Sequence, residues 1–472
     1  MEVTSMNGWS TAGRTRPVRY SIETSCALPR YTPVGRFRVL RHEKTCINCG
    51  RCIKECIYDV HRRKHEDPRL MDEPLSHLCK NCFRCIQQCP TRSLSKILNP
   101  EYLRLGDEYW TPEIITSTWL QAETGRIPVF GAGYRGPFSG PGFDSMWTDM
   151  SEIVRPTRDG IHGREYIHTG IDLGRKPDHL EFDGAGNLAG LPARVVHLPI
   201  PVLFGAFPVD LYGTKVAEAV CLAARSLGTF FAFDPGNWPS LLNRYSSSGV
   251  PRIGDDLEKA RASIQGAAMV EIPFSKDWGK KLEQIRKINP DALVSVALPF
   301  TPDADTAVEA LAAGSADVIH LMADRHGRAP LLPGSPFLKD ALQWIHLHLV
   351  EKRIRDEVTL LASGGIAAAE HVPKAIISGA DGVVITYPLL IGLECLACRE
   401  CSLPDTCPRE IRHIDPDWGA TRMINLMAAW QNQLLEVLGA MGLREVRRLR
   451  GETGRALYFD QLEREVFQEE FR

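Results

Sequence analysis

The sequence predicts an α/β protein built around a (β/α)8 barrel. Across residues 202–387, short strands rich in Val, Ile, Ala and Phe alternate with amphipathic helices, and seven such strands can be counted. This alternation favours a closed parallel barrel over an open sheet. Of the 14 cysteines, all but Cys26 and Cys221 fall into three closely spaced groups of four. The 472 residues leave room for two or three domains.

The composition narrows the class of protein. A net charge of -2 argues against a nucleic-acid-binding protein. The first thirty residues lack an apolar core, and no run of eighteen apolar residues occurs, so we expect a cytoplasmic protein without membrane insertion. Residues 1–40 form a basic arm, which is either solvated or docks on an acidic partner.

The first two cysteine groups lie in residues 41–100 and share the spacing C-x2-C-x2-C-x3-C. Three thiolates on a tight loop can hold three corners of a cubane, and the fourth cysteine reaches the other cluster, as in the small bacterial ferredoxins that this segment resembles. We therefore predict a ferredoxin-like α+β module with two [4Fe–4S] clusters; zinc is the weaker alternative. One cluster is assigned to Cys46, Cys49, Cys52 and Cys89, and the other to Cys79, Cys82, Cys85 and Cys56.

Residues 101–200 are rich in Gly and Pro and predict a linker and barrel-capping segment. Its Arg155, Arg158, Arg164 and Arg175 either meet an anion or belong to a loop held at the barrel mouth. In the barrel, residues 201–412, we expect a helix with Thr214 as its N-cap and Gly228 as its stop. Later helices are expected over DDLEKARASIQ, KDWGKKLEQIRKI, DADTAVEALAAG, PFLKDALQWIHLHLVEKRI and AAAEHVPKAIISGA. Residues 413–472 predict a C-terminal helical tail.

Two cofactor signals follow one another near the end of the barrel. A strand that ends in Ser363, Gly364 and Gly365 and a next strand that opens at Gly382 suit a phosphate, because glycine lets backbone N–H groups approach an anion. The third cysteine group comes directly afterwards. We therefore expect a flavin phosphate site beside an iron–sulfur cluster.

Several motifs together resemble the FMN-binding domain of glutamate synthases, best in the short archaeal-type form with its own ferredoxin module. They are FGA at 204–206, QGA at 265–267, ASGGI at 362–366, GADGVVI at 379–385 and the terminal cysteine group. The resemblance implies FMN, electrons from ferredoxin-like centres and reduction of an imine of 2-oxoglutarate. It places Gly205 and Ala206 under the flavin and Gln265 near its ring and the substrate. Ser363, Gly364, Gly365 and Gly382 would surround the phosphate.

The sequence departs from that family where the substrate is expected. Asp234 stands where a substrate-facing glutamate is usual, and it is either a proton-transferring group or a turn residue. Ala268 and Ala297 replace two lysines, and an unpaired buried anion is costly. The replacement cations expected from loops are Arg325, His326, Arg328 and Lys339.

The third cysteine group consists of Cys395, Cys398, Cys401 and Cys407. Because a fourth thiolate is present, [4Fe–4S] is favoured over the family's [3Fe–4S] cluster. The leading prediction is an iron–sulfur flavoprotein oxidoreductase acting on a small imine or oxo acid. The alternative is a non-catalytic electron-transfer or scaffold subunit, and both predict redox partner proteins or other subunits.

Overall fold

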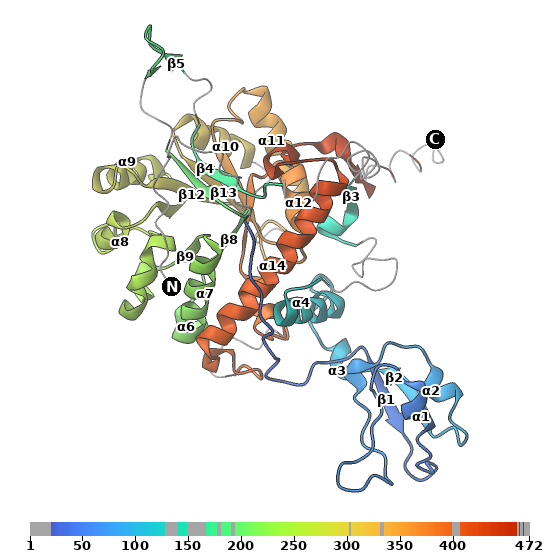
Figure 1. Ribbon diagram of the computed structural model, residues 1–472. Coiled ribbons are helices and arrows are strands. Elements are labelled where there is room, and N and C mark those ends of the chain that lie inside the picture. Colours follow the sequence, from blue (N-terminus) through green and yellow to red (C-terminus); the bar gives the residue numbers. More distant parts are fainter. Residues whose placement is uncertain are drawn as a thin grey trace.

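The computed structural model describes residues 20–127, 140–148, 167–176, 181–189, 194–301, 304–330, 335–398 and 406–459, together with Leu462 and Val466. Cys401, Arg155, Arg158 and Arg164 lie outside these ranges. Figure 1 shows a large barrel domain and a small lobe at its lower right, formed by the chain between β1 and α3.

Among the described residues, eight parallel strands form one sheet in the order β10-β9-β8-β15-β14-β13-β12-β11. A bridge between Arg252 and Glu271 joins the two outer strands, and the Ile253 N–H donates to the Glu271 carbonyl at 2.8 Å. The predicted barrel is thereby confirmed. Its strands are β8 (Val202–Phe204), β9 (Phe231–Phe233), β10 (Gly249–Pro251), β11 (Met269–Pro273), β12 (Leu293–Pro299), β13 (Val318–Met322), β14 (Thr359–Ser363) and β15 (Gly382–Ile385).

Strand β10 is the one that the periodicity does not reveal. It has three residues, and a 3₁₀ helix, η6 (Ser240–Ser248), precedes it in place of an α-helix. The remaining connections contain the predicted helices with two differences: the first begins at Thr214 with Gly213 as its N-cap, and the helix expected over residues 255–265 forms only at Arg261–Gln265. The helices around the barrel are α7 (Thr214–Leu227), α8 (Arg261–Gln265), α9 (Trp278–Ile288), α10 (Ala304–Ala313), α11 (Leu338–Glu351), α12 (His371–Ile377) and α13 (Tyr387–Gly392).

A hairpin covers the N-terminal end of the barrel. Strands β4 (Ile171–Gly174) and β7 (Val195–Leu198) pair antiparallel, and the Thr359 hydroxyl at the start of β14 donates to the Gly174 carbonyl at 2.9 Å. Next to them, Arg175 pairs with Glu357. This arginine therefore lies at the end opposite to the mouth, where no anion was expected.

A long C-terminal helix, α14 (Pro416–Ala440), packs along α7 and α4 (Pro112–Thr124), as Figure 1 shows. Its Arg422 is 1% exposed and donates to the carbonyls of Gly392, Ala27 and Trp119 at 2.6, 3.0 and 3.2 Å. One guanidinium thus joins the tail, the barrel, α4 and the N-terminal arm. Residues 20–30 of that arm lie against the barrel and α4, where the Tyr20 hydroxyl donates to the Leu227 carbonyl and the Arg30 N–H donates to Glu394.

The small lobe is the expected α+β module. Strands β1 (Phe37–Arg41) and β2 (Leu94–Leu98) pair antiparallel. Two short helices, α1 (Arg51–Glu55) and α2 (Arg84–Gln87), lie between them in the sequence. Each helix begins within its own cysteine motif. Helix α3 (Pro100–Leu103) leads from the module back to the barrel. None of the helices in the described part of the chain is both long enough and apolar enough to span a membrane.

Candidate functional site

A cavity of about 160 Å³ lies inside the barrel toward the carboxyl ends of the strands. Side chains alternate along each strand, so every second residue points inward. The walls are mainly apolar, from residues such as Leu203, Val250 and Leu361. Gly205 and Ala206, which follow β8, and Thr386, which follows β15, also line it. The cavity is at the end of a (β/α)8 barrel where active sites are found.

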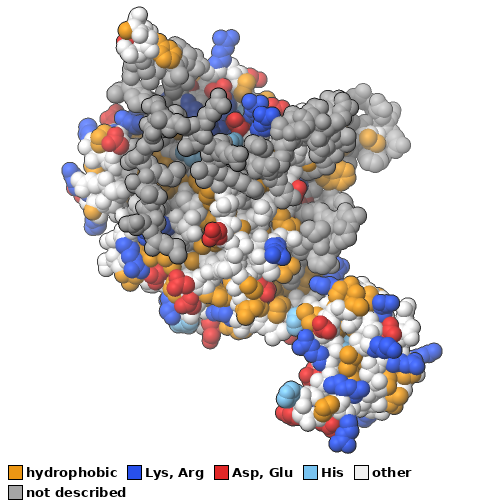
Figure 2. Space-filling view, in the orientation of Figure 1, with side chains coloured by type: hydrophobic (Ala, Val, Ile, Leu, Met, Phe, Trp, Pro, Cys, Tyr) orange, Lys and Arg blue, Asp and Glu red, His pale blue; other side chains and the backbone are white. Residues whose placement is uncertain are grey.

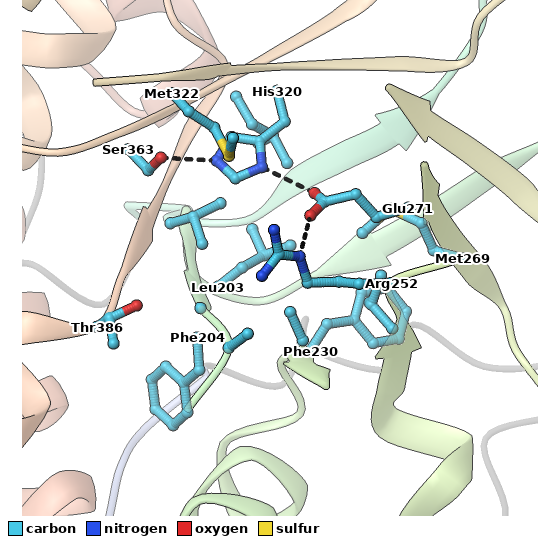
Figure 3. Close-up of a pocket in the computed structure, with 16 residues that line it drawn as sticks. Leu203, Phe204, Phe230, Arg252, Met269, Glu271, His320, Met322, Ser363 and Thr386 are labelled. Atoms are coloured by element: carbon cyan, nitrogen blue, oxygen red, sulfur yellow. Dashed lines mark hydrogen bonds and ion pairs between the residues drawn. The ribbon is translucent and has the colours of Figure 1, made fainter. Parts of the chain in front are cut away.

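Four polar side chains from four strands or strand ends form one row across this cavity (Figure 3). Glu271 accepts from the Arg252 Nε at 3.2 Å, and its other oxygen lies 2.8 Å from His320 Nδ1. His320 Nε2 lies 2.9 Å from the Ser363 hydroxyl. The row connects a cation, a carboxylate, an imidazole and a hydroxyl, which together can bind an anion and move a proton.

The negative charge of Glu271 is buried but is compensated by its neighbours in the row. Glu271 is 7% exposed and His320 is 5% exposed. Burial opposes ionisation of Glu271, but the charges and hydrogen bonds of His320 and Arg252 outweigh it and hold the pKa of that carboxyl below its ordinary value. Glu271 therefore stays ionised in the barrel and fixes the orientation of the imidazole.

Arg252, Glu271 and His320 were not predicted from the sequence. His320 pairs in register with Ala297, one of the positions where the resemblance led us to expect a lysine, so an imidazole on the neighbouring strand lies beside that position. The alternation of inward residues along VIHLM was the signal that could have found it. The register between strands cannot be predicted from one sequence, so the sequence does not show that these side chains meet.

The loop cations expected instead are engaged elsewhere. His326 and Arg325 face Asp107, at 2.9 and 3.7 Å. Arg328 donates to the Ser335 carbonyl at 2.5 Å, and Lys339 pairs with Asp340 at 2.7 Å. The residues that line the described cavity include none of these four.

The structure brings some of the predicted flavin-site residues together and separates others. Gly205, Ala206 and Ser363 line the cavity, and Asp234 follows β9 at its mouth, 3.9 Å from Arg252 Nη1. Gln265 does not reach this site: it is exposed and ends α8, before β11. Residues that precede a barrel strand lie at the N-terminal end, opposite to the cavity.

Only some of the residues predicted to surround the phosphate lie together in the structure. Gly364 and Gly365 have φ values of 95° and 67°, a region that strongly favours glycine. A Cβ on Gly365 would lie 2.7 Å from Gly327 Cα, and its carbonyl accepts from the Tyr109 hydroxyl. Gly382 opens β15 next to Ile171 of the hairpin, so it lies at the other end of the barrel and is not part of this turn.

The first cysteine quartet is gathered in the module. Cys46, Cys49, Cys52 and Cys89 line one small cavity. Burial raises the pKa of Cys52; Arg41 opposes this rise, and the nearby Cys46 and Cys49 thiols add to it. The four thiols are those that the spacing assigned to one cluster, with the fourth taken from the second motif.

The second quartet is gathered in the same way. Burial raises the pKa of Cys85 to about 11, and the thiols of Cys79, Cys56 and Cys82 add to the rise because they are close neighbours. Thiols that raise one another's pKa release their protons when a metal cluster binds them. The set again matches the assignment from spacing, with Cys56 contributed by the first motif.

The third cysteine motif lies where the module's connection meets the barrel. Cys395 is buried, and Cys398 and Cys407 are half-buried; Cys401 is outside the described residues. The Leu396 carbonyl accepts from the Gly106 N–H at 3.2 Å. The motif therefore contacts the segment that connects the module to Tyr109 and the glycine turn.

Comparisons with known proteins agree with the resemblance expected from the motifs. Residues 257–444 match a family model described as a conserved region in glutamate synthase. The archaeal-type glutamate synthase [NADPH] of Dehalococcoides mccartyi is 27% identical over 88% of this chain and 94% of its own length. The archaeal glutamate synthases [NADPH] of Archaeoglobus fulgidus and Methanocaldococcus jannaschii are 25% and 26% identical over 88% and 91% of this chain, and 92% and 96% of their own lengths.

Among solved structures, the crystal structure of mandelate oxidase aligns with 65% of this chain and 97% of its own length, at 15% identity and a TM-score of 0.39. The sequence comparisons span the module and the barrel together. The resemblance to glutamate synthases is thereby confirmed over most of the chain.

Proposed function

We propose that this chain is an iron–sulfur flavoprotein oxidoreductase that resembles archaeal-type glutamate synthases and reduces a small imine or 2-oxo acid. The observation that carries the proposal is the row of Arg252, Glu271, His320 and Ser363 inside the barrel. A barrel used only as a scaffold would have no need to keep an ionised carboxylate in its interior, where it is costly to desolvate, or to pair it with Arg252, which is half-buried at the mouth.

The cavity suits the aromatic end of a flavin. A dry cavity of about 150 Å³ accommodates one benzene ring, and this one measures about 160 Å³ with mainly apolar walls. The apolar walls would hold the ring, and Gly205 and Ala206, which line the same cavity, would lie against the cofactor. When bound, FMN would collect electrons singly and deliver them as a hydride.

Each polar side chain of the row has a role in this proposal. The outer nitrogens of Arg252 would bind a substrate carboxylate at the mouth. His320 would give the proton from Nε2 to the atom that becomes an amine or hydroxyl, while Glu271 holds Nδ1 and stabilises the charged ring. Ser363 would keep Nε2 in position, and Asp234 would limit the free charge of Arg252.

Electron supply is assigned to the thiol groups. Two quartets of thiols are gathered in the module, and a third motif begins at the buried Cys395. Cysteine thiolates in such sets hold [4Fe–4S] clusters. We assign two to the module and favour a third [4Fe–4S] site, rather than [3Fe–4S], beside the barrel.

The activity is tested with anaerobically purified protein, reduced by dithionite and freed of excess reductant. On mixing with 2-oxoglutarate and ammonium, flavin absorbance should return and glutamate should form in proportion. Flavin that returns with a different imine or oxo acid would change the substrate class alone. Flavin that stays reduced with every such substrate would contradict the proposed reaction.

A further inference from the structure

The ferredoxin-like module is strongly basic, although the whole chain is slightly acidic. Residues 37–98 contain 13 Lys and Arg against 7 Asp and Glu, an excess of six positive charges in a chain of net charge -2. Figure 2 shows more blue than red side chains over this lobe. A field of one sign attracts partners of the opposite sign and speeds their encounter.

Part of this charge surrounds the thiols of the first motif. Arg41 and Arg51 line the same small cavity as Cys49. The Arg63 guanidinium lies over the motif loop, where it donates to the Asn48 carbonyl at 3.2 Å. Cys49 itself is exposed, so a partner at this surface would come close to the cluster ligands.

Apolar side chains accompany the cations. Ile47, between the first two cysteines of the motif, is 64% exposed, and Leu70 is 41% exposed. The segment that contains Leu70 is held against the motif loop, because the Met71 N–H donates to the Asn48 side chain at 3.2 Å. Exposed apolar residues with a basic rim are typical of protein interfaces. We call Ile47, Cys49, Arg51, Arg63, Arg69 and Leu70 the first-motif face.

The first residues of the second motif face the barrel, whereas Cys82 and Phe83 after them are exposed. A cleft of about 880 Å³ separates the two lobes, and the module lines it with residues 35–37 and 77–81, including Cys79. On the other side it is lined by Trp119, Glu394 and Arg409. The Cys79 quartet is therefore the inner one, next to the motif that begins at Cys395, and the Cys46 quartet is the outer one.

We propose that the first-motif face is the docking site of an acidic one-electron carrier protein. This inference rests on the proposed function and names its partner. Each docking would oxidise the carrier by one electron and reduce the site held by the outer quartet by one, with no atom exchanged. Two dockings supply the two electrons of one substrate reduction, which also takes up two protons: one would be taken from solvent and delivered to carbon as part of the hydride, and the other would reach nitrogen or oxygen through His320.

The test uses the full chain, purified anaerobically, and a plant-type [2Fe–2S] ferredoxin of strongly negative charge as the probe. We expect saturable binding at low salt that weakens at least about tenfold in about 0.5 M salt. Arg51→Glu should weaken it roughly tenfold or more. Arg84→Glu is the matched control, because Arg84 opens α2 as Arg51 opens α1. Arg261→Glu controls for a remote charge on the barrel, and neither control should change the affinity more than about twofold.

Three results would overturn the docking proposal. They are no binding by the wild type, equal weakening by Arg51→Glu and Arg84→Glu, and equally tight binding of a redox-inactive protein of the same size and charge. Iron and flavin are measured in every sample. A wild type that holds both cofactors and binds no carrier contradicts the docking site alone, whereas a wild type without flavin contradicts the proposed function.

Discussion

His320 is held by hydrogen bonds at both ring nitrogens. Because ionised Glu271 only accepts, Nδ1 carries a hydrogen, and in the neutral ring Nε2 then accepts from the Ser363 hydroxyl. When Nε2 is protonated, only the hydrogen bond to Ser363 changes direction, and Nε2 then donates to the hydroxyl oxygen. A ring that can gain and lose one proton without moving suits repeated proton transfer.

Replacing His320 with Gln should separate proton transfer from binding. The amide can keep one hydrogen bond but cannot exchange a proton, so we expect turnover to fall by about 10²-fold or more with flavin content unchanged. Stopped-flow measurement of flavin reoxidation gives the rate. His320→Asn is the comparison, and a reoxidation rate within about threefold of wild type in His320→Gln would show that another group supplies the proton.

Glu271 gives the barrel a pH dependence of known sign. Its pKa is lower in the folded protein than its ordinary value of 4.5, so the unfolded state binds more protons between the two values. The stabilisation is present above about pH 4.5 and is lost as pH falls through the folded pKa. Urea unfolding of wild type and Glu271→Gln should therefore give a difference in the free energy of unfolding that shrinks as the pH falls below about 4.5. A difference that grew on acidification would contradict the ionised carboxylate.

At the scale of elements, the glycine turn after β14 is fixed by protein packing as well as by any ligand. The Trp110 Nε1–H donates to the Arg325 carbonyl at 3.0 Å, and Tyr109 bonds the Gly365 carbonyl. The segment that returns from the module thus packs against the loop after β13 and the turn after β14.

Gly365→Val should remove flavin while the module keeps its iron. A side chain there meets Gly327 backbone at 2.7 Å and needs a left-handed φ, so we expect a cost of about 1–3 kcal/mol and a displaced turn. Gly184→Val is the control, because nothing lies within 4 Å of its Cβ position. Retained flavin in Gly365→Val would place the phosphate elsewhere.

We expect buried Arg422 to make a large contribution to the free energy of unfolding, because it holds the C-terminal helix α14 to the rest of the chain. Arg422→Met removes the side-chain donor from the buried carbonyls of Gly392 and Ala27, at roughly 1–3 kcal/mol each, and a second donor from the Trp119 carbonyl inside α4. The urea midpoint should fall clearly, whereas Arg261→Met, at a site where the arginine side chain is 53% exposed, should leave it nearly unchanged. Similar midpoints for both variants would contradict the joining role of Arg422.

Features that depend on residues close together in the sequence could be predicted, and features that depend on distant residues could not. The cysteine quartets depend on spacing within short loops, and the long strands depend on local periodicity, so both could be anticipated. Gln265 and Gly382 were expected at the flavin, but each comes before or opens a strand and lies at the opposite end of the barrel. Arg252, Glu271 and His320 meet only through strand register, and β10 is too short for a periodic signal.

At the scale of the molecule, the chain connects an outer thiol quartet, an inner quartet, a third cysteine motif and the barrel cavity. The third motif contacts Gly106, and Tyr109 a few residues later contacts the glycine turn. One continuous segment therefore links the cysteine-rich module to the proposed flavin site.

In the proposed function, this one chain holds both iron–sulfur clusters and a flavin. Anaerobic purification followed by iron, sulfide and flavin analysis tests it most directly. Three [4Fe–4S] clusters predict about 12 iron atoms per chain, together with one FMN released on denaturation. Iron without flavin, in protein that is folded and purified without loss, would contradict the account and support an electron-transfer or scaffold subunit.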